Sequence, residues 1–262
     1  MSATRIAETT APEVARRLAA GAAILLPMGS TETHGPALPM GDYLFAEAIA
    51  ARIAEAAIAR GDDALVAPPI PFGGEDYFTG IPGGVTLSSP LLQAVIEEAA
   101  EQFRRHAARI LFVNGHGGNI HAVEAAARSL RRKHGLVIPT LHLWRSAGAL
   151  HAELGGAKES FGHGGDPVLS VALHLRPDLC RPDQAGPRRP AAPFLGLAVA
   201  GYGSVAGEGA EFAVPIEAEE VAPGGVFAAD PRGASAAHGA RIVERLAAAG
   251  AAMLAQLKGH AA

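Results

Sequence analysis

Two carboxylates and a histidine lie close together in the loop that follows an apolar run near the start of the chain. Residues 24–28 read Ile-Leu-Leu-Pro-Met, and Glu32, His34 and Asp42 follow in a stretch rich in glycine and proline. Carboxylate oxygens and imidazole nitrogens this close together on an irregular loop suit a divalent metal ion. Because Glu-x-His also arises by chance in a chain with 26 acidic residues and 11 histidines, a solvated loop stays open from this stretch alone.

Three histidines share a glycine-flanked setting. His34 precedes a glycine, and His116 and His163 each lie between two glycines. Glycine beside a ligand lets the backbone come close and lets the imidazole turn toward an ion. A lone histidine is usually a surface or hydrogen-bonded core group, but two of these three come directly after predicted strands. The shared setting favours ligands over three unrelated histidines.

The carboxylates Glu32, Asp42 and Asp166, with His34 and His116, could hold two divalent ions. Two ions about 3.5–4 Å apart, bridged by a carboxylate and a water, generate hydroxide at neutral pH and polarise a carbonyl. A separate histidine could then protonate the leaving nitrogen. These residue types therefore suit metal-assisted hydrolysis.

Other catalytic classes lack their sequence signatures. The chain has no Gly-x-Ser-x-Gly elbow of a serine hydrolase. Residues 114–119, Asn-Gly-His-Gly-Gly-Asn, have no lysine after their glycines and do not match a phosphate-binding loop. They also do not match the Gly-x-Gly-x-x-Gly of a dinucleotide turn. The pattern therefore argues against a serine hydrolase and a nicotinamide enzyme.

The composition is that of a globular protein. With 262 residues, 18% charged and 49% hydrophobic, the chain is long enough for one α/β domain spanning 1–262. A net charge of -4 gives no basic face for nucleic acid. The single cysteine, Cys180, fits a reducing compartment. Because the first residues lack a signal-peptide core and no apolar run reaches the ~18 residues of a membrane span, we expect a cytoplasmic protein without a membrane partner.

Apolar runs and helical periodicity alternate through most of the chain. Strands are predicted at 22–27, 64–68, 109–113 and 136–143. Helices are predicted at 12–18, 43–60, 88–108, 120–134, 168–175 and 235–257. The alternation predicts a mostly parallel sheet covered on both faces, with ligands beyond the carboxyl ends of its strands. The loops after the first and third strands, and Trp144 after the fourth, would share that edge.

Two segments break the alternation. Residues 71–87 contain five glycines and two prolines, which is typical of an exposed loop that carries binding groups. Prolines and glycines also recur at about 176–223. We interpret this second segment as a loop-rich excursion, a lid or a subunit contact, rather than a second domain.

The motifs resemble those of the creatininase family (creatinine amidohydrolase and relatives). The family's Gly-x-x-Glu-x-His-Gly-x-x-Leu-Pro loop, which ends in aspartate, is similar to residues 29–42, and its Asn-Gly-His-Gly-Gly-Asn turn is present letter for letter at 114–119. Residues 79–86 and 229–231 are looser matches. The resemblance spans nearly the whole chain. It implies a three-layer α/β/α sandwich with a mostly parallel central sheet, assembled as a homo-oligomer, typically a hexamer.

The resemblance also implies the roles of single residues. Sites of the creatininase family hold two divalent ions, so we expect two ions here, with zinc as the first choice and manganese or iron as alternatives. Glu32 and His116 would hold one ion and His34 the other, with Asp42 between them. Residues 163–166, His-Gly-Gly-Asp, are similar to a His-Ala-Gly-Glu segment, which makes His163 the catalytic acid/base and Asp166 a ligand. By the same resemblance Trp144 would contact the substrate, with packing at a strand end as the alternative. We expect Asn119 or backbone amides to help stabilise the oxyanion.

The chain departs from creatinine-cleaving members at several positions. Its spacing from Glu32 to Asp42 is one residue shorter than usual, and Gly118 stands where those enzymes carry glutamate. Glu159 and Ser160 stand where they carry Trp-Asp, and Val168 replaces a second glutamate. These departures argue against creatinine itself as the substrate.

The leading hypothesis is a metal-dependent amidohydrolase that cleaves a non-peptide C–N bond, cyclic or formamide-like, in a small-molecule amide by metal-bound hydroxide. One alternative is a metallopeptidase that trims a small peptide precursor, as one branch of the family does. The other is a metal-binding family member without catalytic activity.

Overall fold

A parallel sheet of four strands forms the centre of the molecule. The computed structural model describes residues 4–74, 78, 80–222 and 224–260, so residues 75–77 and Thr79 of the predicted binding loop lie outside it. The strands are β1 (Ala23–Met28), β2 (Ala64–Val66), β5 (Ile110–Asn114) and β6 (Thr140–His142), in the order β2-β1-β5-β6. β1, β2 and β5 are buried along their whole length, which explains their unbroken apolar runs.

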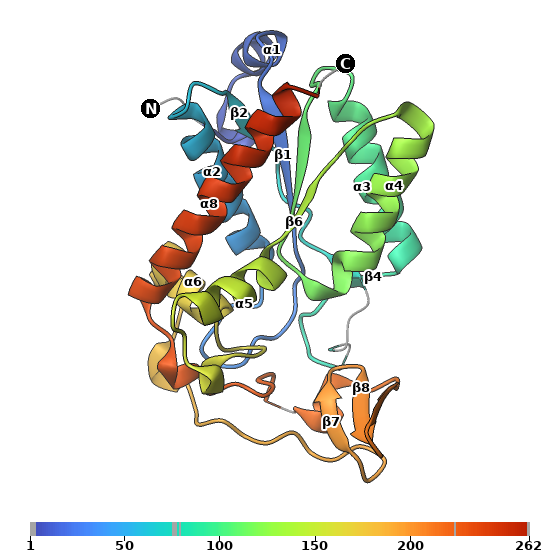
Figure 1. Ribbon diagram of the computed structural model, residues 1–262, viewed down its shortest axis with the longest axis vertical. Helices are drawn as coiled ribbons and strands as arrows, with labels where there is room; N and C mark the ends of the chain where they lie inside the picture. Colours follow the sequence, from blue (N-terminus) through green and yellow to red (C-terminus); the bar gives the residue numbers. More distant parts are fainter. Residues whose placement is uncertain (1–3, 75–77, 79, 223, 261–262) are drawn as a thin grey trace.

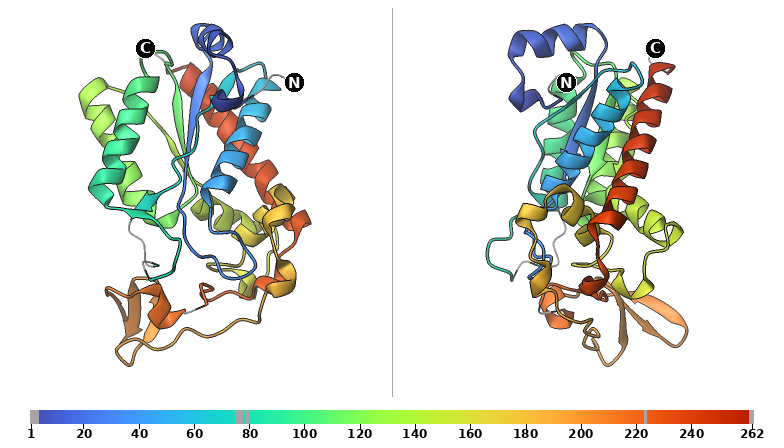
Figure 2. Two further views of the ribbon diagram at one scale, coloured as in Figure 1. Left: turned by 180° about the vertical axis from the view of Figure 1, so that it is seen from behind. Right: turned by 90° about the vertical axis from the view of Figure 1, so that its left-hand side faces the viewer.

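Helices cover both faces of this sheet, as Figures 1 and 2 show. One face packs on α2 (Tyr43–Ile58), α5 (Leu143–Glu153) and α8 (Ala236–Lys258). The other packs on α3 (Ser89–Phe103) and α4 (Ile120–His134), with α1 (Ala11–Ala19) at its margin. The predicted α/β/α sandwich with a mostly parallel central sheet is confirmed. No helix in the described ranges is both long and apolar enough to span a bilayer.

The region after β5 differs from the prediction. The strand predicted at 136–143 is only three residues long. Residues 136–139 form no strand, although Pro139 O accepts from Phe112 N of β5, and Val137 is exposed. Helix α5 begins directly after β6, so Trp144 lies in the first turn of a helix rather than beyond a strand end. Apolar residues continue across the boundary between strand and helix (Leu141, Leu143 and Trp144), and periodicity alone does not divide such a short segment.

Residues 176–223 contain regular structure that the sequence did not reveal. Strands β7 (Ala198–Gly201), β8 (Ser204–Gly207) and β9 (Ala210–Ala213) form an antiparallel sheet, which we call the arm. The strands are only four residues long. β7 (Ala-Val-Ala-Gly) has no polar residue to alternate with its apolar ones, and β9 is exposed throughout, so neither of these two strands gives a clear strand signal in the sequence. Figure 1 shows the arm in orange, at the end of the molecule toward which β1 runs. A small apolar cluster of its own, which includes Val205 and Ile216, holds it together.

The remaining elements are short. β3 (Gly73–Gly74) pairs with β4 (Thr86–Leu87), and α6 (Val168–Leu175) packs against α8. α7 (Ala218–Val221) follows the arm. Short 3-10 turns occupy Ile6–Glu8, Gly117–Asn119, Lys158–Ser160, Pro177–Leu179, Pro182–Gln184 and Pro231–Gly233.

A buried arginine ties the amino-terminal edge of the sheet together. Arg109 donates to both carboxylate oxygens of Asp62 (2.7 and 2.9 Å), to Gly21 O and to Leu254 O. Burial raises the pKa of Asp62, but the Arg109 guanidinium outweighs it, so the pKa lies below its usual value.

We expect Arg109→Met to lower the free energy of unfolding by about 3–5 kcal/mol, because it leaves the Asp62 carboxylate without its main partner. A lowered carboxylate pKa stabilises the fold above the unfolded pKa, and this contribution is lost as the pH falls. The difference between variant and wild type should therefore be largest at neutral pH. Denaturant titration across pH measures it, with the exposed Arg245–Glu153 pair as control, where Arg245→Ala should cost less than about 1 kcal/mol.

Candidate metal centre

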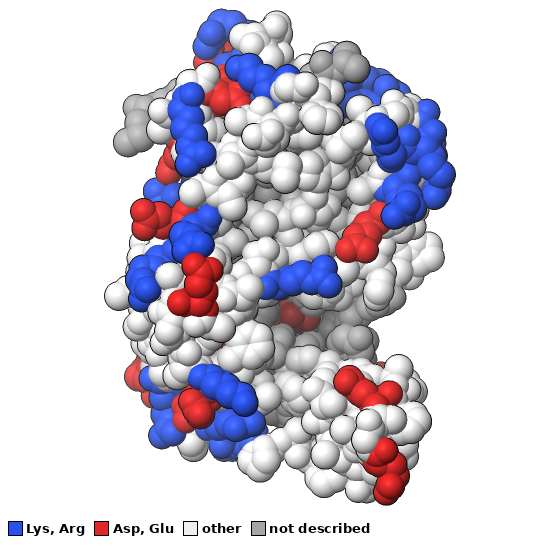
Figure 3. All heavy atoms as spheres, viewed as in Figure 1, with Lys and Arg blue, Asp and Glu red and all other residues white. Residues whose placement is uncertain are grey.

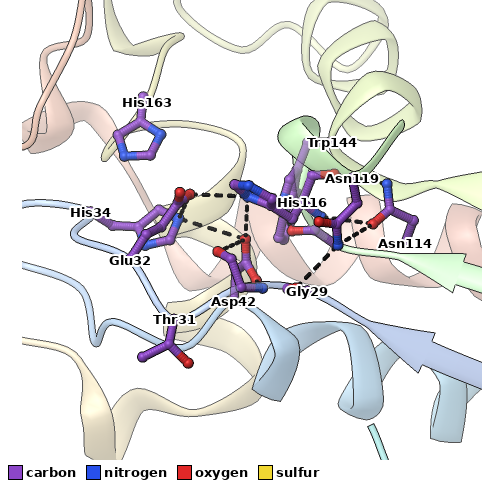
Figure 4. Close-up of polar contacts among 12 residues, drawn as sticks. Gly29, Thr31, Glu32, His34, Asp42, Asn114, His116, Asn119, Trp144 and His163 are labelled. Atoms are coloured by element: carbon purple, nitrogen blue, oxygen red, sulfur yellow. Dashed lines mark hydrogen bonds and ion pairs between the residues drawn. The ribbon is translucent and has the colours of Figure 1, made fainter. Parts of the chain in front are cut away.

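Four predicted ligands from two loops meet at the carboxyl ends of β1 and β5. Glu32, His34 and Asp42 come from the loop after β1, and His116 comes from the turn after β5. His116 Nδ1 lies 3.1 Å from Glu32 Oε1 and 3.3 Å from Asp42 Oδ2. His34 Nε2 lies 3.4 Å from Glu32 Oε1 and 4.0 Å from Asp42 Oδ2. Both carboxylates therefore lie between the two imidazoles, as Figure 4 shows.

Backbone and side-chain contacts bring Asp42 into this cluster in spite of its shortened spacing from Glu32. Ser30 N donates to Asp42 Oδ1 (2.5 Å) and Ser30 Oγ to Asp42 Oδ2 (3.2 Å). Glu32 N donates to Met40 O, which closes the loop on itself. Gly29 makes room for the turn, because a Cβ there would lie 2.2 Å from Asp42 Oδ1. Although the spacing from Glu32 to Asp42 is one residue shorter than the usual family pattern, these contacts keep Asp42 close to His116.

Burial and close charges shift the pKa values in this cluster strongly. Burial raises the pKa of Glu32, but the neighbouring His116 outweighs it and lowers the pKa to about 2. Burial raises the pKa of Asp42 to about 6, although His116 opposes the shift. Burial, with His163 next, lowers the pKa of His34 to about 3. Burial alone would lower the pKa of His116, but Glu32 and Asp42 raise it well above its usual value.

The donor set fits divalent ions. Among the residues that the structure describes, two groups of side chains bring their ligand atoms within 4.8 Å of one another: Glu32, His34 and His163, and Glu32, Asp42 and His116. His34 Nδ1 and His116 Nε2 are buried and have no hydrogen-bond partner within the described ranges. Such atoms are costly unless a ligand or a rearrangement satisfies them. Carboxylates with imidazoles are ligands that zinc and manganese accept.

His163 lies beside this cluster, and two aromatic rings stack on its imidazole. It stacks on His34 (ring centroids 4.6 Å apart) and on Phe78 (4.7 Å). Its Nε2 lies 2.7 Å from Thr33 O. Because a carbonyl oxygen only accepts, Nε2 must carry the hydrogen, and the neutral ring has its lone pair on Nδ1. This geometry fits a group that accepts a proton at one defined atom.

Asp166 is close to this site, but its hydrogen bonds run to its own segment. Ser160 Oγ donates to Asp166 Oδ2 (2.8 Å), while Ser170 donates to Oδ1 from both its N (3.2 Å) and its Oγ (2.5 Å). Asp166 belongs to neither of the two ligand groups found among the described residues. These bonds join the segment that carries His163 to the start of α6.

Asn119 contacts the protein with every polar atom of its side chain. Its Oδ1 accepts from Gly74 N, and its Nδ2 donates to Gly29 O and Asn114 Oδ1. The residue is fully buried. Both amide hydrogens are donated within the protein, so the oxyanion contact expected of Asn119 has no donor left in this arrangement. Asn119 instead joins the loops after β1 and β5.

A cavity of about 520 Å³ opens over the cluster. Figure 3 shows the surface hollowed between the arm and the rest of the molecule. Trp144 lines the cavity, and its Nε1 donates to Gly115 O. Sequence reasoning missed the aromatic walls contributed by Phe78, Phe161, Tyr202 and Phe227. They come from irregular segments and the arm, where only their aromatic character among glycines could have marked them.

The sequence model of one protein family, described as "Creatininase: Creatinine amidohydrolase", matches residues 7–254. The chain belongs to the creatininase family. A creatininase of known structure aligns over 98% of both chains at 25% identity with a TM-score of 0.75. A creatininase described as the Mn form and a mutant of the Zn-Zn type each share 24% identity and a TM-score of 0.74, which supports the fold alone.

A curated relative of this creatininase-family chain carries a different name. The mycofactocin precursor peptide peptidase of Mycolicibacterium smegmatis is 37% identical over 157 residues, which cover 59% of this chain and 58% of the relative. The alignment thus spans less than two thirds of that protein. These matches place the chain in the creatininase family.

The raised pKa of His116 predicts how ion binding responds to pH in this creatininase-family chain. Without an ion, the imidazole keeps its proton at neutral pH beside Glu32. An ion binds the deprotonated ring, so binding must release that proton. We expect the affinity to rise about tenfold per pH unit below the pKa of His116, as one released proton requires. Calorimetric titrations with Zn²⁺ or Mn²⁺ in buffers of different ionisation enthalpy count the protons, and a pH-independent affinity without proton release contradicts this expectation.

Proposed function

We propose that this chain is a metal-dependent hydrolase that cleaves an amide C–N bond. One observation carries the proposal: the buried carboxylate–imidazole cluster, with two unpartnered ring nitrogens among the described residues, lies beside His163 at a cavity. The same cluster on a protein that only binds metal would not need a histidine with a fixed tautomer next to it. The family match supports hydrolysis independently.

We assign Glu32, Asp42 and His116 as the residues that would hold one ion, and His34 with Glu32 as those that would hold a second. For both ions we expect zinc or manganese in preference to iron. Ions held there would lower the pKa of water and polarise a carbonyl group. His163 accepts a proton at Nδ1 and returns it to the leaving nitrogen, while its Nε2 stays bonded to Thr33 O. Trp144 and the other aromatic walls exclude water from the substrate.

In this proposal Asp166 and Asn119 are positioning residues, which hold the segments that carry His163 and His116. Asp166 receives three hydrogen bonds from Ser160 and Ser170, which hold the segment of His163. Asn119 holds the turn of His116 against Gly29 and Gly74. In this arrangement oxyanion stabilisation is left to the ions and to backbone amides.

Two substrate classes remain, and two observations favour the end of a short peptide over a small cyclic amide or formamide. The cavity of about 520 Å³ is larger than a single small ring requires. The relative at 37% identity over 157 residues is named a peptide peptidase, whereas the creatininase of known structure described above is 25% identical over 98% of this chain. The non-peptide amide is the second candidate, and it rests on the family description.

The experiment compares substrates with one protein preparation. Protein reconstituted with Zn²⁺ or Mn²⁺ is incubated with short linear peptides, the same peptides cyclised head to tail, small cyclic amides and formamides, and products are identified by mass spectrometry. We expect chelator-sensitive release of residues from the linear peptides. Turnover of cyclic amides or formamides alone would shift the function to the non-peptide class. No turnover of any of them by ion-loaded protein would contradict the proposal.

A further inference from the structure

The arm brings one aromatic side chain to the candidate acid/base. Tyr202 occupies the turn between β7 and β8 and lines the cavity. Its ring meets the ring of His163 edge-on, with centroids 5.2 Å apart and planes 88° apart. It meets Phe78 edge-on at 5.3 Å. Tyr202 thus contacts both His163 and one of the two rings stacked on it.

Tyr202 also contacts the backbone segment that supports His163. Its ring packs on Phe227 with centroids 4.6 Å apart. Phe227 N donates to His163 O (3.0 Å), and the two residues form an isolated antiparallel bridge. A substitution at Tyr202 would therefore affect the position of the imidazole directly, and also through the backbone segment that carries it.

The surroundings of His163 leave one role open to Tyr202. His34 and Phe78 are stacked nearly parallel to the imidazole, at 13° and 22°, and stacked rings oppose tipping of the imidazole out of its plane. Parallel neighbours do not prevent the ring from sliding or turning within its own plane. The ring of Tyr202 contacts the imidazole and is perpendicular to it, so it is suited to oppose that motion.

We infer that Tyr202 is a positioning residue for His163, and that the arm is part of the active site because it supplies this ring. The inference rests on the proposed function, in which His163 transfers the proton. It goes beyond that function because it assigns a role to a segment 39 positions further along the chain, outside the motifs of the metal centre.

The ring rather than the hydroxyl carries the proposed role. Burial, with a smaller contribution from Glu32, raises the pKa of the Tyr202 phenol above its usual value, so the hydroxyl stays protonated. A protonated phenol is no base, and the three ring contacts do not require the oxygen. Phenylalanine can make the same contacts, which gives a conservative variant.

The kinetic test uses Tyr202→Leu, Tyr202→Phe and a control on the same arm. Tyr202→Leu should lower kcat about 10- to 100-fold with little change in KM, because a displaced acid/base is less effective while binding is retained. Tyr202→Phe should restore most of kcat. Phe212→Ala removes an exposed ring of β9 and should match the wild type. Ion content and circular dichroism should be equal in all four proteins.

Three kinetic results would overturn the inference. A rise in KM with unchanged kcat would show that Tyr202 contacts the substrate rather than positions His163. An equal loss in Tyr202→Phe would assign the role to the hydroxyl. Loss of bound ions in Tyr202→Leu would assign it to the metal centre.

A spectroscopic test needs no substrate, so it separates failure of this inference from failure of the proposed function. Side-chain ¹H–¹⁵N correlation spectra of the ion-loaded protein report which nitrogen of His163 is protonated, and His163→Gln assigns the signal. We expect the Nε2-protonated tautomer in wild type and Tyr202→Phe, and a mixture of tautomers in Tyr202→Leu. If Tyr202→Leu does not fold, Tyr202→Met takes its place, because an unbranched side chain fills the space without a ring. A wild-type tautomer in the ringless variant overturns the inference.

Discussion

Glu32→Gln is expected to abolish both ion retention and hydrolysis. Glu32 belongs to both ligand groups among the described residues and lies within 3.4 Å of His34 and His116. Glutamine has nearly the same shape but lacks the negative charge. Because loss of a partner one shell further out already weakens ion binding by about 10- to 100-fold, loss of this ligand should exceed that. Ion content by mass spectrometry and turnover at saturating substrate measure both effects.

A matched control for Glu32→Gln is Glu55→Gln on α2, an exposed carboxylate paired with Arg52. It carries the same chemical change on the helix that follows Asp42, and it should leave ions and turnover at the wild-type level. If Glu32→Gln kept the wild-type ion content, the cluster would not be the metal centre.

His163→Ala should lower kcat by about 10²- to 10⁴-fold, the usual contribution of a positioned acid/base, while the bound ions are retained. The proton then has to reach the leaving nitrogen from water. Ion content and kcat are measured on the same preparation, since the two together define the role. His174→Ala, at an exposed position on α6, is the control and should behave as wild type.

Two outcomes would change this account of His163. Unchanged turnover would exclude proton transfer by its imidazole. Loss of an ion would make it a ligand with Glu32 and His34, a group that the geometry also allows.

The centre of the fold and the metal cluster were accessible from the sequence because both depend on short-range signals. Strands such as β1 and β5 are buried on both faces, so they appear as unbroken apolar runs. Parallel strands place their carboxyl ends at one edge, which is enough to bring Glu32 near His116. Residue type, together with the resemblance of the motifs to the creatininase family, then made these side chains candidate ligands.

What the sequence did not reveal depends on long-range packing. Tyr202 reaches His163 only because the arm folds back over the sheet edge. Strands of four residues such as β9 are too short to show a hydrophobic periodicity that would predict the arm. The orientation of Asn119 depends on Gly29 and Gly74, which are distant in sequence. Hydrogen bonding of this kind cannot be read from residue type.

The most direct test of the account is the ion content of the wild-type chain beside that of Glu32→Gln and His116→Ala. The proteins are purified without added metal, reconstituted with Zn²⁺ or Mn²⁺ and dialysed, and ions per chain and chelator-sensitive amide hydrolysis are measured together. The account predicts two ions per wild-type chain, hydrolysis that disappears with the ions, and loss of both in the two variants. A wild-type chain that retains no ion, or variants that hold as much as the wild type, would contradict it.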